Sequence, residues 1–366
     1  MAEEGWFESP GMRVASPDEW CGSRGPGGRR VTIRDVAEAA GVSPMTVSNV
    51  LNSRAGTSTA ETRARVLGAV ERLGYRRQAA ARGLRLAVHE AVGMIVIDAA
   101  PNFLADPFTT HLVAGLSNEL NRRGHAILLQ GMPPEGLADS PMVRGLRTDA
   151  LCALLSGGPR VRRRCVELLA GLGQPIVLFQ ETLRVSQGDV CAIRQDDFAG
   201  GLMLGRMVLG RGARRLVMLV PERCWPAIGE RVRGVRAAVR GSGRAVPLRI
   251  IRAPERERLA TEAAVRGEIA SQGLPDAILC GNDQMALAAV SVLGAEGFAI
   301  PGDVMVTGFN GFDFWRHTEP LLTSVQSAAY ELGMRGGREA LARLQMGAFG
   351  SRDIVLPVTL LPGMSV

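Results

Sequence analysis

Residues 31–52 read VTIRDVAEAAGVSPMTVSNVLN, and this stretch predicts two short helices joined by a tight turn. Residues 32–35 have the pattern of a capping box, which opens the first helix. Gly41 breaks that helix, Ser43 can cap the second, and Pro44 suits its first position because proline lacks the N–H that would be unpaired there. Such a pair is typical of the helix-turn-helix motif, whose second helix enters the major groove of DNA.

A third helix is expected beyond a polar loop, starting near Thr59 and ending at Gly74. The spacing of Val66, Val70 and Leu73 places these apolar side chains on one face of that helix. The stretch therefore predicts a small three-helix domain. Because small helical domains are common, this pattern alone does not establish binding to DNA.

Positive charge is concentrated in the same part of the chain. Residues 29–88 contain eleven Arg and four acidic residues, a local excess equal to the net charge of +7 of the whole chain. A basic module joined to a nearly neutral body indicates a nucleic acid as the partner of that module. A solvated arginine-rich surface is the alternative interpretation, which the charge alone leaves open.

The second helix offers side chains that suit base and phosphate contacts. Asn49 can bind an adenine edge through two hydrogen bonds, and Met45 can contact a thymine methyl group. Hydroxyl and amide side chains at Thr46, Ser48 and Asn52 can bind phosphates. The exposed early part of this helix is therefore the predicted recognition surface.

Beyond about residue 89 the sequence alternates short apolar runs with amphipathic segments. This pattern predicts parallel strands that are covered by helices on both faces. The number of units indicates an α/β body of two doubly wound lobes, and sheets of this kind bind ligands beyond the carboxyl ends of their strands. The apolar runs are Ala91–Ile97, Ala126–Leu129, Ala150–Leu155, Pro175–Phe179, Leu216–Val220, Leu248–Ile251, Ala277–Cys280 and Val304–Phe309.

Composition argues against several other classes of protein. The six Cys are scattered without a CxxC pair, so we expect core residues of a reducing compartment and no metal site. No apolar stretch reaches the ~18 residues that a membrane span needs. The acidic amino-terminal segment also lacks the pattern of a secretory signal. We expect a cytoplasmic, nucleoid-associated protein that has no cofactor and does not bind a membrane.

Two rival functions share the α/β body. A periplasmic solute-binding protein would need a signal peptide and would carry no helix-turn-helix. An α/β enzyme would be expected to show a nucleotide-binding motif, but we find no GxGxxG opening a first helix, and the absence of Lys excludes a P-loop. The four His are widely spaced and indicate neither a catalytic triad nor a metal site. We therefore expect no enzymatic activity and assign no catalytic residues.

Residues 31–52 resemble the DNA-binding signature of the lactose/galactose repressor family, and Thr62-Arg63 and Leu73-Gly74-Tyr75 fit the same pattern. The resemblance implies a homodimer bound to a pseudo-palindromic operator. It also implies a hinge helix after Tyr75 that folds on the operator and enters the minor groove. The set of expected DNA contacts is Thr32, Ser43, Pro44, Met45, Thr46, Ser48, Asn49, Asn52, Tyr75, Gln78, Ala81 and Leu84.

The hinge departs from the family pattern at one place. Ala81 and Leu84 match it, and Leu84 is either an apolar wedge between the central base pairs or an ordinary linker residue. The usual Pro-Asn pair is Arg77-Gln78 in this chain. Gly83 weakens an isolated helix by about 1 kcal/mol relative to Ala, whereas the added Arg can compensate through phosphate contacts.

The resemblance continues more loosely through the body and implies a periplasmic-binding-protein-like architecture with an effector between its lobes. The matching segments are residues 106–108, 230–234, 282–287, 308–310, 320–325 and 332–333. The expected effector-binding residues are Phe108, Gln180, Arg231, Asp283 and Asn310.

Each of these assignments has a structural alternative. Arg231 can grip vicinal hydroxyls or a carboxylate, or it can be a surface arginine. Asp283 can orient the pocket or cap a helix, and Phe108 can stack on a ligand or belong to the core. Gln180 and Asn310 replace Asp residues that are usual in the family, which argues against a simple sugar. A nucleoside, a polyol or an acidic metabolite remains open.

The sequence thus predicts four segments: a disordered extension at 1–28, a helix-turn-helix domain at 29–75, a hinge at 76–88 and a two-lobed effector-binding and dimerisation domain at 89–366. The expected function is that of a transcriptional regulator, most simply a repressor controlled by a small molecule. An activator, or a repressor that needs a corepressor, fits the same pattern, because an effector populates whichever state it prefers.

Overall fold

The computed structural model of the protein describes residues 31–51, 58–75, 89–98, 102–145, 148–182, 188–223 and 225–366. The chain divides into two compact units, with the division between Ala87 and Val88. The expected disordered extension at 1–28 and the expected hinge at 76–88 lie outside the described residues.

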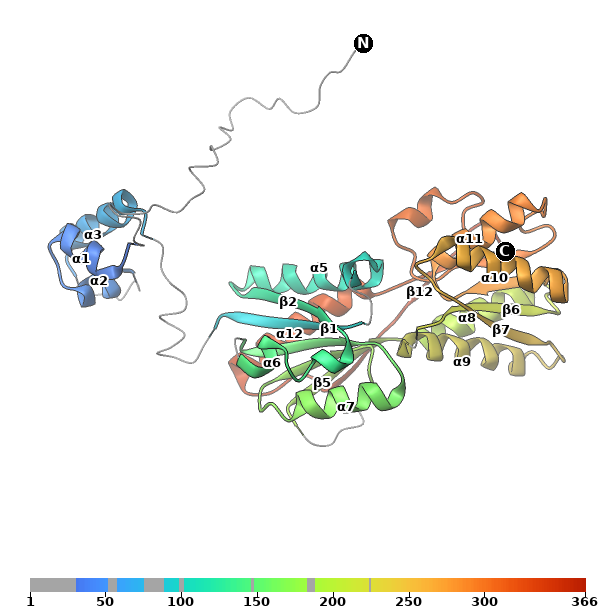
Figure 1. Ribbon diagram of the computed structural model, residues 1–366, viewed down its shortest axis with the longest axis horizontal. Coiled ribbons are helices and arrows are strands. Elements are labelled where there is room, and N and C mark those ends of the chain that lie inside the picture. The colour runs from blue at the N-terminus through green and yellow to red at the C-terminus, as the bar shows by residue number, and fades with distance from the viewer. Residues whose placement is uncertain are drawn as a thin grey trace, which may run out of the picture. The chain divides into compact units, whose positions relative to one another are not determined.

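In the described part of the first unit there are three helices, α1 (Ile33–Ala40), α2 (Pro44–Leu51) and α3 (Ala60–Leu73), shown in blue in Figure 1. All three pack around one small core, in which the side chains of Val36, Val47 and Val66 are buried. Because each helix contributes one apolar stripe to this core, the remaining face of each is directed to solvent.

The ends of these helices follow the predicted caps. The Thr32 hydroxyl accepts from the backbone N–H of Asp35, whose carboxylate in turn accepts from the backbone N–H of Thr32, which completes the capping box. The Thr59 hydroxyl accepts from the Thr62 N–H at 3.2 Å. Gly41 ends α1 with a φ of 63°, a left-handed conformation that glycine adopts without steric cost.

The first lobe of the second unit is built on a six-stranded sheet with the order β11-β5-β4-β3-β1-β2, in which all neighbours are parallel. Helices α5 (Pro107–Arg122) and α12 (Ala329–Met346) pack on one face, and α6 (Pro141–Gly145) and α7 (Pro159–Ala170) on the other (Figure 1). The strands are β1 (Ala91–Ile97), β2 (Ala126–Met132), β3 (Ala150–Leu155), β4 (Ile176–Phe179), β5 (Val190–Gln195) and β11 (Asp353–Leu356).

The second lobe has a four-stranded parallel sheet with the order β7-β6-β8-β9. Its two faces are covered by α8 (Asp197–Gly210) with α9 (Pro226–Gly241), and by α10 (Arg258–Gln272) with α11 (Asp283–Ala295). The strands are β6 (Leu216–Pro221), β7 (Leu248–Ala253), β8 (Ala277–Cys280) and β9 (Met305–Thr307). The predicted class, two doubly wound parallel lobes behind a helical domain, is confirmed.

Short elements complete the body. An antiparallel ribbon joins β10 (Ser324–Gln326) to β12 (Thr359–Leu361). Single-turn 3₁₀ helices lie at Phe103–Ala105, Pro134–Gly136 and Asp313–His317. Among the described residues, no helix is both long and apolar enough to cross a bilayer.

The chain crosses between the lobes at three places: between β5 and α8, between β10 and α12, and between β11 and β12. The second crossing returns the chain to the first lobe, where α12 packs against α5 and β11 joins the sheet beside β5. Each lobe is therefore assembled from separate stretches of sequence, and the crossings connect the lobes at the site between them.

Each of the eight predicted apolar runs overlaps a strand: the runs at β1, β3 and β8 match the strand bounds, and the other bounds differ by one to three residues. The sequence prediction missed β5, β10, β11 and β12. Edge strand β11 is short, with only three apolar residues after Asp353, and alternates exposed with half-buried residues.

Candidate functional site

Helix α2 presents a polar face and an apolar face. Val47 and Val50 are buried against α1 and α3, whereas Ser43, Pro44 and Met45 are exposed, with 60 % of the Met45 side chain accessible. Thr46, Ser48 and Asn49 are half-buried beside them. The first turn of α2 and the residues that follow it thus form one continuous surface made of the residues predicted to contact bases and phosphates.

Some of the hydroxyls on this surface also hold the helix. The Ser43 hydroxyl accepts from the backbone N–H of Thr46 at 3.1 Å and lies 2.9 Å from the Thr46 hydroxyl. Thr32 caps α1, and the half-buried ring of Tyr75 packs on the small core after α3. The other predicted DNA contacts, at Asn52, Gln78, Ala81 and Leu84, lie outside the described residues. All twelve assignments to DNA remain predictions.

In the second unit, an inner pocket lies between the two lobes at the carboxyl ends of their strands. Its walls include Phe108, Gln180, Trp225, Arg231, Glu255 and Asn310. Open parallel sheets bind ligands at this edge because the loops that follow the strands converge there. Four of the five residues predicted to bind the effector, Phe108, Gln180, Arg231 and Asn310, line this pocket.

Arg231 extends from α9 and is held by both charge and shape. Its side chain is only 4 % exposed, so it is not a surface arginine. Its Nε donates to Asp197 Oδ1 at 2.8 Å, its Nη1 to the carbonyl oxygen of Gly281, and its Nη2 to Asn310 Oδ1 at 3.2 Å. The guanidinium carbon lies 3.6 Å from the centre of the Phe309 ring. A buried guanidinium with this many contacts is a fixed donor group in the pocket wall.

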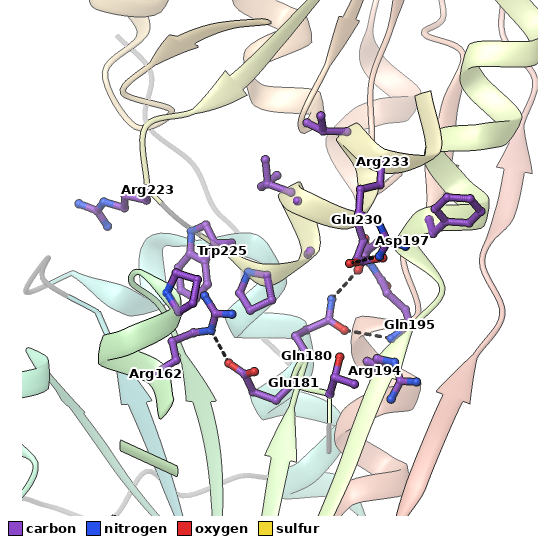
Figure 2. Close-up of a pocket in the computed structure, with 18 of the residues that line it drawn as sticks. Arg162, Gln180, Glu181, Arg194, Gln195, Asp197, Arg223, Trp225, Glu230 and Arg233 are labelled. Carbon is purple, nitrogen blue, oxygen red and sulfur yellow. Dashed lines mark hydrogen bonds and ion pairs between the residues drawn. The ribbon is translucent and has the colours of Figure 1, made fainter. Parts of the chain in front are cut away.

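Gln180 follows β4 and belongs to a hydrogen-bonded network with the first crossing between the lobes. Its Nε2 donates to Asp197 Oδ2 at 3.0 Å, and its Oε1 accepts from the backbone N–H of Gln195 at 2.9 Å. Figure 2 shows these contacts beside Arg194 and Glu230. The network fixes the side-chain amide of Gln180 at the point where the chain passes from one lobe to the other.

Two of the pocket residues have unusual backbone conformations. Gln180 has a φ of 58° and Asn310 a φ of 109°, values that residues other than glycine adopt at a cost of about 1–3 kcal/mol. Strain of this kind gathers at ligand sites, because the surrounding structure holds the residue where its side chain is needed. This observation supports a binding role for both amides.

Asn282 and Asp283 open α11, but only Asn282 caps it. Asn282 Oδ1 accepts from the Met285 N–H at 2.9 Å. The Asp283 carboxylate accepts from the Ser324 hydroxyl and from the Gly311 N–H, both at 2.6 Å. Asp283 therefore supports the loop that carries Asn310, and its predicted direct contact with an effector remains a prediction.

The burial of Asp283 makes the free energy of unfolding depend on pH. Burial raises the pKa of this carboxyl to about 6, although the Ser324 and Gly311 hydrogen bonds and the Arg231 charge oppose the shift. Because the native carboxyl binds its proton at a higher pH than the unfolded chain does, its contribution to stability is present at low pH and is lost as the pH rises from about 4 to about 6. A shift of about two pKa units corresponds to a loss on the order of 3 kcal/mol.

Asp283→Asn is expected to flatten the pH dependence of the unfolding free energy between pH 4 and 6, as measured by urea unfolding at several pH values. Asp139→Asn, which removes an exposed carboxylate, is the matched control and is expected to keep the slope of the unchanged protein. An unchanged slope in Asp283→Asn would assign the pH dependence to other groups.

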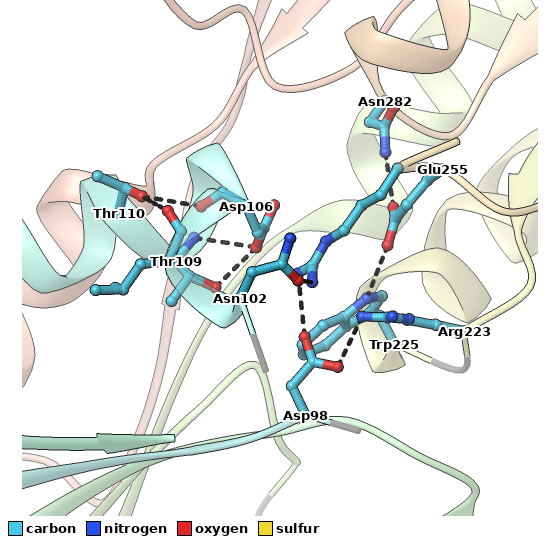
Figure 3. A network of polar contacts seen from close by, with 11 residues as sticks. Asp98, Asn102, Asp106, Thr109, Thr110, Arg223, Trp225, Glu255 and Asn282 are labelled. Atoms are coloured by element: carbon cyan, nitrogen blue, oxygen red, sulfur yellow. Dashed lines mark hydrogen bonds and ion pairs between the residues drawn. The ribbon is translucent and has the colours of Figure 1, made fainter. Parts of the chain in front are cut away.

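A second polar network joins the lobes beside the pocket (Figure 3). Asp98 follows β1 in the first lobe, and its side chain is 2 % exposed. From the second lobe, Arg223 donates to Asp98 Oδ1 at 2.7 Å and Arg256 to Asp98 Oδ2 at 3.0 Å. Arg256 also donates to Asn102 at 3.2 Å. Asp98, Arg223 and Arg256, which follow strands of the two sheets, thus connect the two lobes.

Glu255 connects this network to the pocket. One of its oxygens accepts from Asn282 at 2.9 Å and the other from the Trp225 ring N–H at 3.4 Å. Burial, followed by the nearby Asp106 carboxylate, raises its pKa. The sequence prediction missed Trp225, Glu255 and Asp106, yet Glu255 follows directly after β7. The rule that ligands bind beyond strand ends could have identified it.

An outer cleft opens from the pocket between α7 and α9 and has a volume of about 1590 Å³. It shares Gln180 and Trp225 with the inner pocket. Eight of its lining residues are Arg and five are acidic. Some of these charges are paired, as in the 2.5 Å contact of Arg162 with Glu181 drawn in Figure 2. The cleft is therefore lined by more Arg than acidic side chains, although Arg194 and Arg223 pair with Asp353 and Asp98, which lie outside its lining.

Comparison with known proteins finds one matching family model in each of the two units. Residues 32–78 match the model of the bacterial regulatory proteins of the lacI family, and residues 206–366 match that of a periplasmic binding protein-like domain. The chain is 29 % identical to the HTH-type transcriptional regulator CelR of Thermobifida fusca over 86 % of this chain and 92 % of CelR. It is 26 % identical to the HTH-type transcriptional repressor PurR of Histophilus somni, over 83 % and 89 %.

Among solved structures, the fold is similar to that of a Lac repressor dimer bound to its operator and the anti-inducer ONPF. The TM-score is 0.80 at 20 % sequence identity, with 92 % of this chain and 99 % of the other covered. This likeness extends across the helical unit and the two-lobed body.

Proposed function

Since this chain belongs to the lacI family of bacterial regulatory proteins, we propose that it is a sequence-specific DNA-binding repressor controlled by a small molecule bound between its lobes. One observation carries the proposal: the chain combines a capped helix α2, whose outer face is polar, with a body whose lobes form a pocket lined by both polar and apolar side chains. The first feature suits the major groove of DNA, and the second suits an effector.

Several finer statements belong to the same proposal. The segments at 29–75, 76–88 and 89–366 are the DNA-binding domain, the hinge and the effector-binding domain. The protein acts as a homodimer on a pseudo-palindromic operator in the cytoplasm, as the Lac repressor was solved as a dimer on its operator. The pocket binds its ligand without turnover, because the relatives are transcriptional regulators. Saturable binding that leaves the ligand chemically unchanged is the expected result.

Selection of the purified protein against random double-stranded DNA, at about physiological salt, tests the proposal directly, since affinity for DNA depends strongly on salt. We expect enrichment of a two-fold symmetric site. Enrichment of no sequence, with or without a panel of candidate effectors, would contradict the assignment as a sequence-specific DNA-binding protein.

Asn49→Ala is expected to relax base preference at one position of each operator half-site by about 1–3 kcal/mol and to leave the other positions unchanged. The reason is that a bidentate amide contact discriminates one base, whereas a phosphate contact discriminates none. Competition binding with single-base operator variants measures this effect. Arg76→Ala is the comparison variant and should weaken all sequences alike. Equal losses on every sequence in both variants would show that Asn49 does not select a base.

A further inference from the structure

In one part of the inner pocket, the groups that are still free to form hydrogen bonds are mostly donors. The side-chain oxygens of Gln180 and Asn310 already accept from the Gln195 N–H and from Arg231. On Gln180 Nε2, one N–H donates to Asp197 and the second stays available. Among the contacts of the described residues, Asn310 Nδ2 has no partner. These two amides therefore offer N–H groups to a ligand.

Arg231 adds charge to the same cluster. A guanidinium has five N–H groups, and three of them are used by Asp197, Gly281 and Asn310. The Asp197 carboxylate is shared, because it also accepts from Gln180 at 3.0 Å and from Gln195 at 2.9 Å. Arg231 thus keeps two N–H donors in a fixed geometry. Its counter-ion, the Asp197 carboxylate, also accepts hydrogen bonds from Gln180 and Gln195.

Two carboxylates supply acceptors elsewhere in the same pocket. Asp106 Oδ2 accepts from the N–H and the hydroxyl of Thr109, at 3.1 and 2.7 Å, and among the described residues Oδ1 has no hydrogen-bond partner. Glu255 contacts Asn282 and Trp225 (Figure 3), and its carboxylate keeps further lone pairs that can accept hydrogen bonds. Carboxylate oxygens of this kind accept from ligand hydroxyls.

The outer cleft favours anions on their way to the pocket. Its eight Arg exceed its five acidic residues, and it shares Gln180 with the donor cluster of Gln180, Arg231 and Asn310. A cleft lined by one sign of charge raises the local concentration of ligands of the opposite sign. The donor cluster therefore suits an anionic group of the ligand, whereas the Asp106 and Glu255 carboxylates in the same pocket suit its hydroxyls.

We propose that the effector is a hydroxylated anion, a sugar acid or a sugar phosphate. Its carboxylate or phosphate binds the donor cluster of Gln180, Arg231 and Asn310, and its hydroxyls bind Asp106 and Glu255. This inference rests on the proposed function and specifies the chemical class of the ligand at the same site.

Calorimetric titration of the full chain with matched ligand pairs tests the inference. One pair is D-gluconate with D-sorbitol, and the other is D-glucose 6-phosphate with D-glucose, so the two arms separate a carboxylate from a phosphate. In at least one pair, the anion is expected to bind at least tenfold more tightly than its neutral counterpart, with a preference that decreases as salt screens the charges. If neither anion binds, or if the neutral member binds as tightly in both pairs, the inference is overturned.

Asn310→Asp provides the residue-level test, because it places a carboxylate in the donor cluster while keeping the size of the side chain. We expect it to reduce affinity for the anion at least tenfold and to leave affinity for the neutral member the same or higher. Asn121→Asp adds the same charge to an exposed position on α5 and should not change the preference. Equal losses in the two variants would overturn the assignment of the anion to this cluster.

DNA selection and ligand titration on the same protein preparation distinguish a failure of this inference from a failure of the proposed function. If selection yields a symmetric operator whose binding responds to the neutral ligands and not to the anions, the repressor proposal stands and the ligand class is wrong. If charge preference is observed but no DNA sequence is enriched, the ligand class stands and the repressor proposal is wrong.

Discussion

Replacing Arg231 with Ala is expected to lower the free energy of unfolding of the two-lobed body by about 3–5 kcal/mol, because it removes one partner of a buried ion pair. Asp197 is 3 % exposed and would keep its charge without a cation beside it. The Gly281 carbonyl and the Phe309 ring would lose their contacts as well. Because the hydrogen bonds from Gln180 and Gln195 to Asp197 remain, the loss of unfolding free energy is expected near the lower limit of this range. Urea unfolding followed by circular dichroism measures the difference.

Arg233 provides a matched control on the same helix. Its side chain is 64 % exposed and pairs with Glu230 on the surface of α9. Surface ion pairs contribute little because water and salt screen them, so Arg233→Ala should leave the unfolding midpoint unchanged. If both variants unfold at the same urea concentration, the Arg231–Asp197 pair does not stabilise the body as its burial implies.

Gly333→Ala is expected to destabilise the first lobe by about 3 kcal/mol, the upper end of the usual cost of overpacking. A Cβ at Gly333 would lie 2.0 Å from the Leu112 carbonyl oxygen and 2.6 Å from the Leu116 nitrogen. The contact is reciprocal, since a Cβ at Gly115 would lie 2.0 Å from the Tyr330 carbonyl oxygen. Because both obstacles are backbone atoms, the variant can fold only if α5 and α12 move apart. Thermal unfolding should show a lowered midpoint.

The control for Gly333 is a helical glycine at which an added Cβ would contact no other atom. Gly294 lies in α11, is exposed, and has no heavy atom within 4 Å of an added Cβ. Gly294→Ala should therefore raise stability by about 0.5–1 kcal/mol, through helix propensity alone. A Gly333→Ala protein as stable as Gly294→Ala would contradict the close approach of α5 and α12.

Elements whose signals are local could be predicted from the sequence. The caps at Thr32 and Ser43 were identified because a capping residue and the N–H that it accepts from lie three residues apart. For α3 the sequence indicated a cap within residues 58–61, and the structure assigns it to Thr59. Eight strands were identified by their apolar runs, which are typical of parallel strands covered on both faces, and these include the partly exposed edge strands β2 and β7. Strand β11 escaped because it joins the sheet beside β5, from which it is separated by more than 150 residues of sequence. Local periodicity carries no information about that pairing.

The residues of the inner pocket could be predicted only where they belong to segments that resemble the family pattern. Arg231 and Asn310 lie in segments with a family signature, and both line the pocket. Glu255 and Asp98 lie in segments without one, although each follows a strand of a parallel sheet. Asp283 belongs to a predicted motif but contacts Ser324 and Gly311. Which side chain turns towards a pocket and which supports a neighbouring loop depends on contacts between distant segments, and sequence spacing does not report them.

The crossing between β10 and α12 has a consequence for the order in which the protein is made. The core of the first lobe contains Leu332, Ala340 and Leu341 from α12, and these residues leave the ribosome after the whole sheet of the second lobe. Domains usually fold as units during synthesis, starting from the amino-terminal end. Here the first lobe stays incomplete until the last part of the chain has emerged. The core of the first lobe is therefore completed only after the sheet of the second lobe has been synthesised, and a chain that stops before Ala329 leaves the apolar face of α5 uncovered.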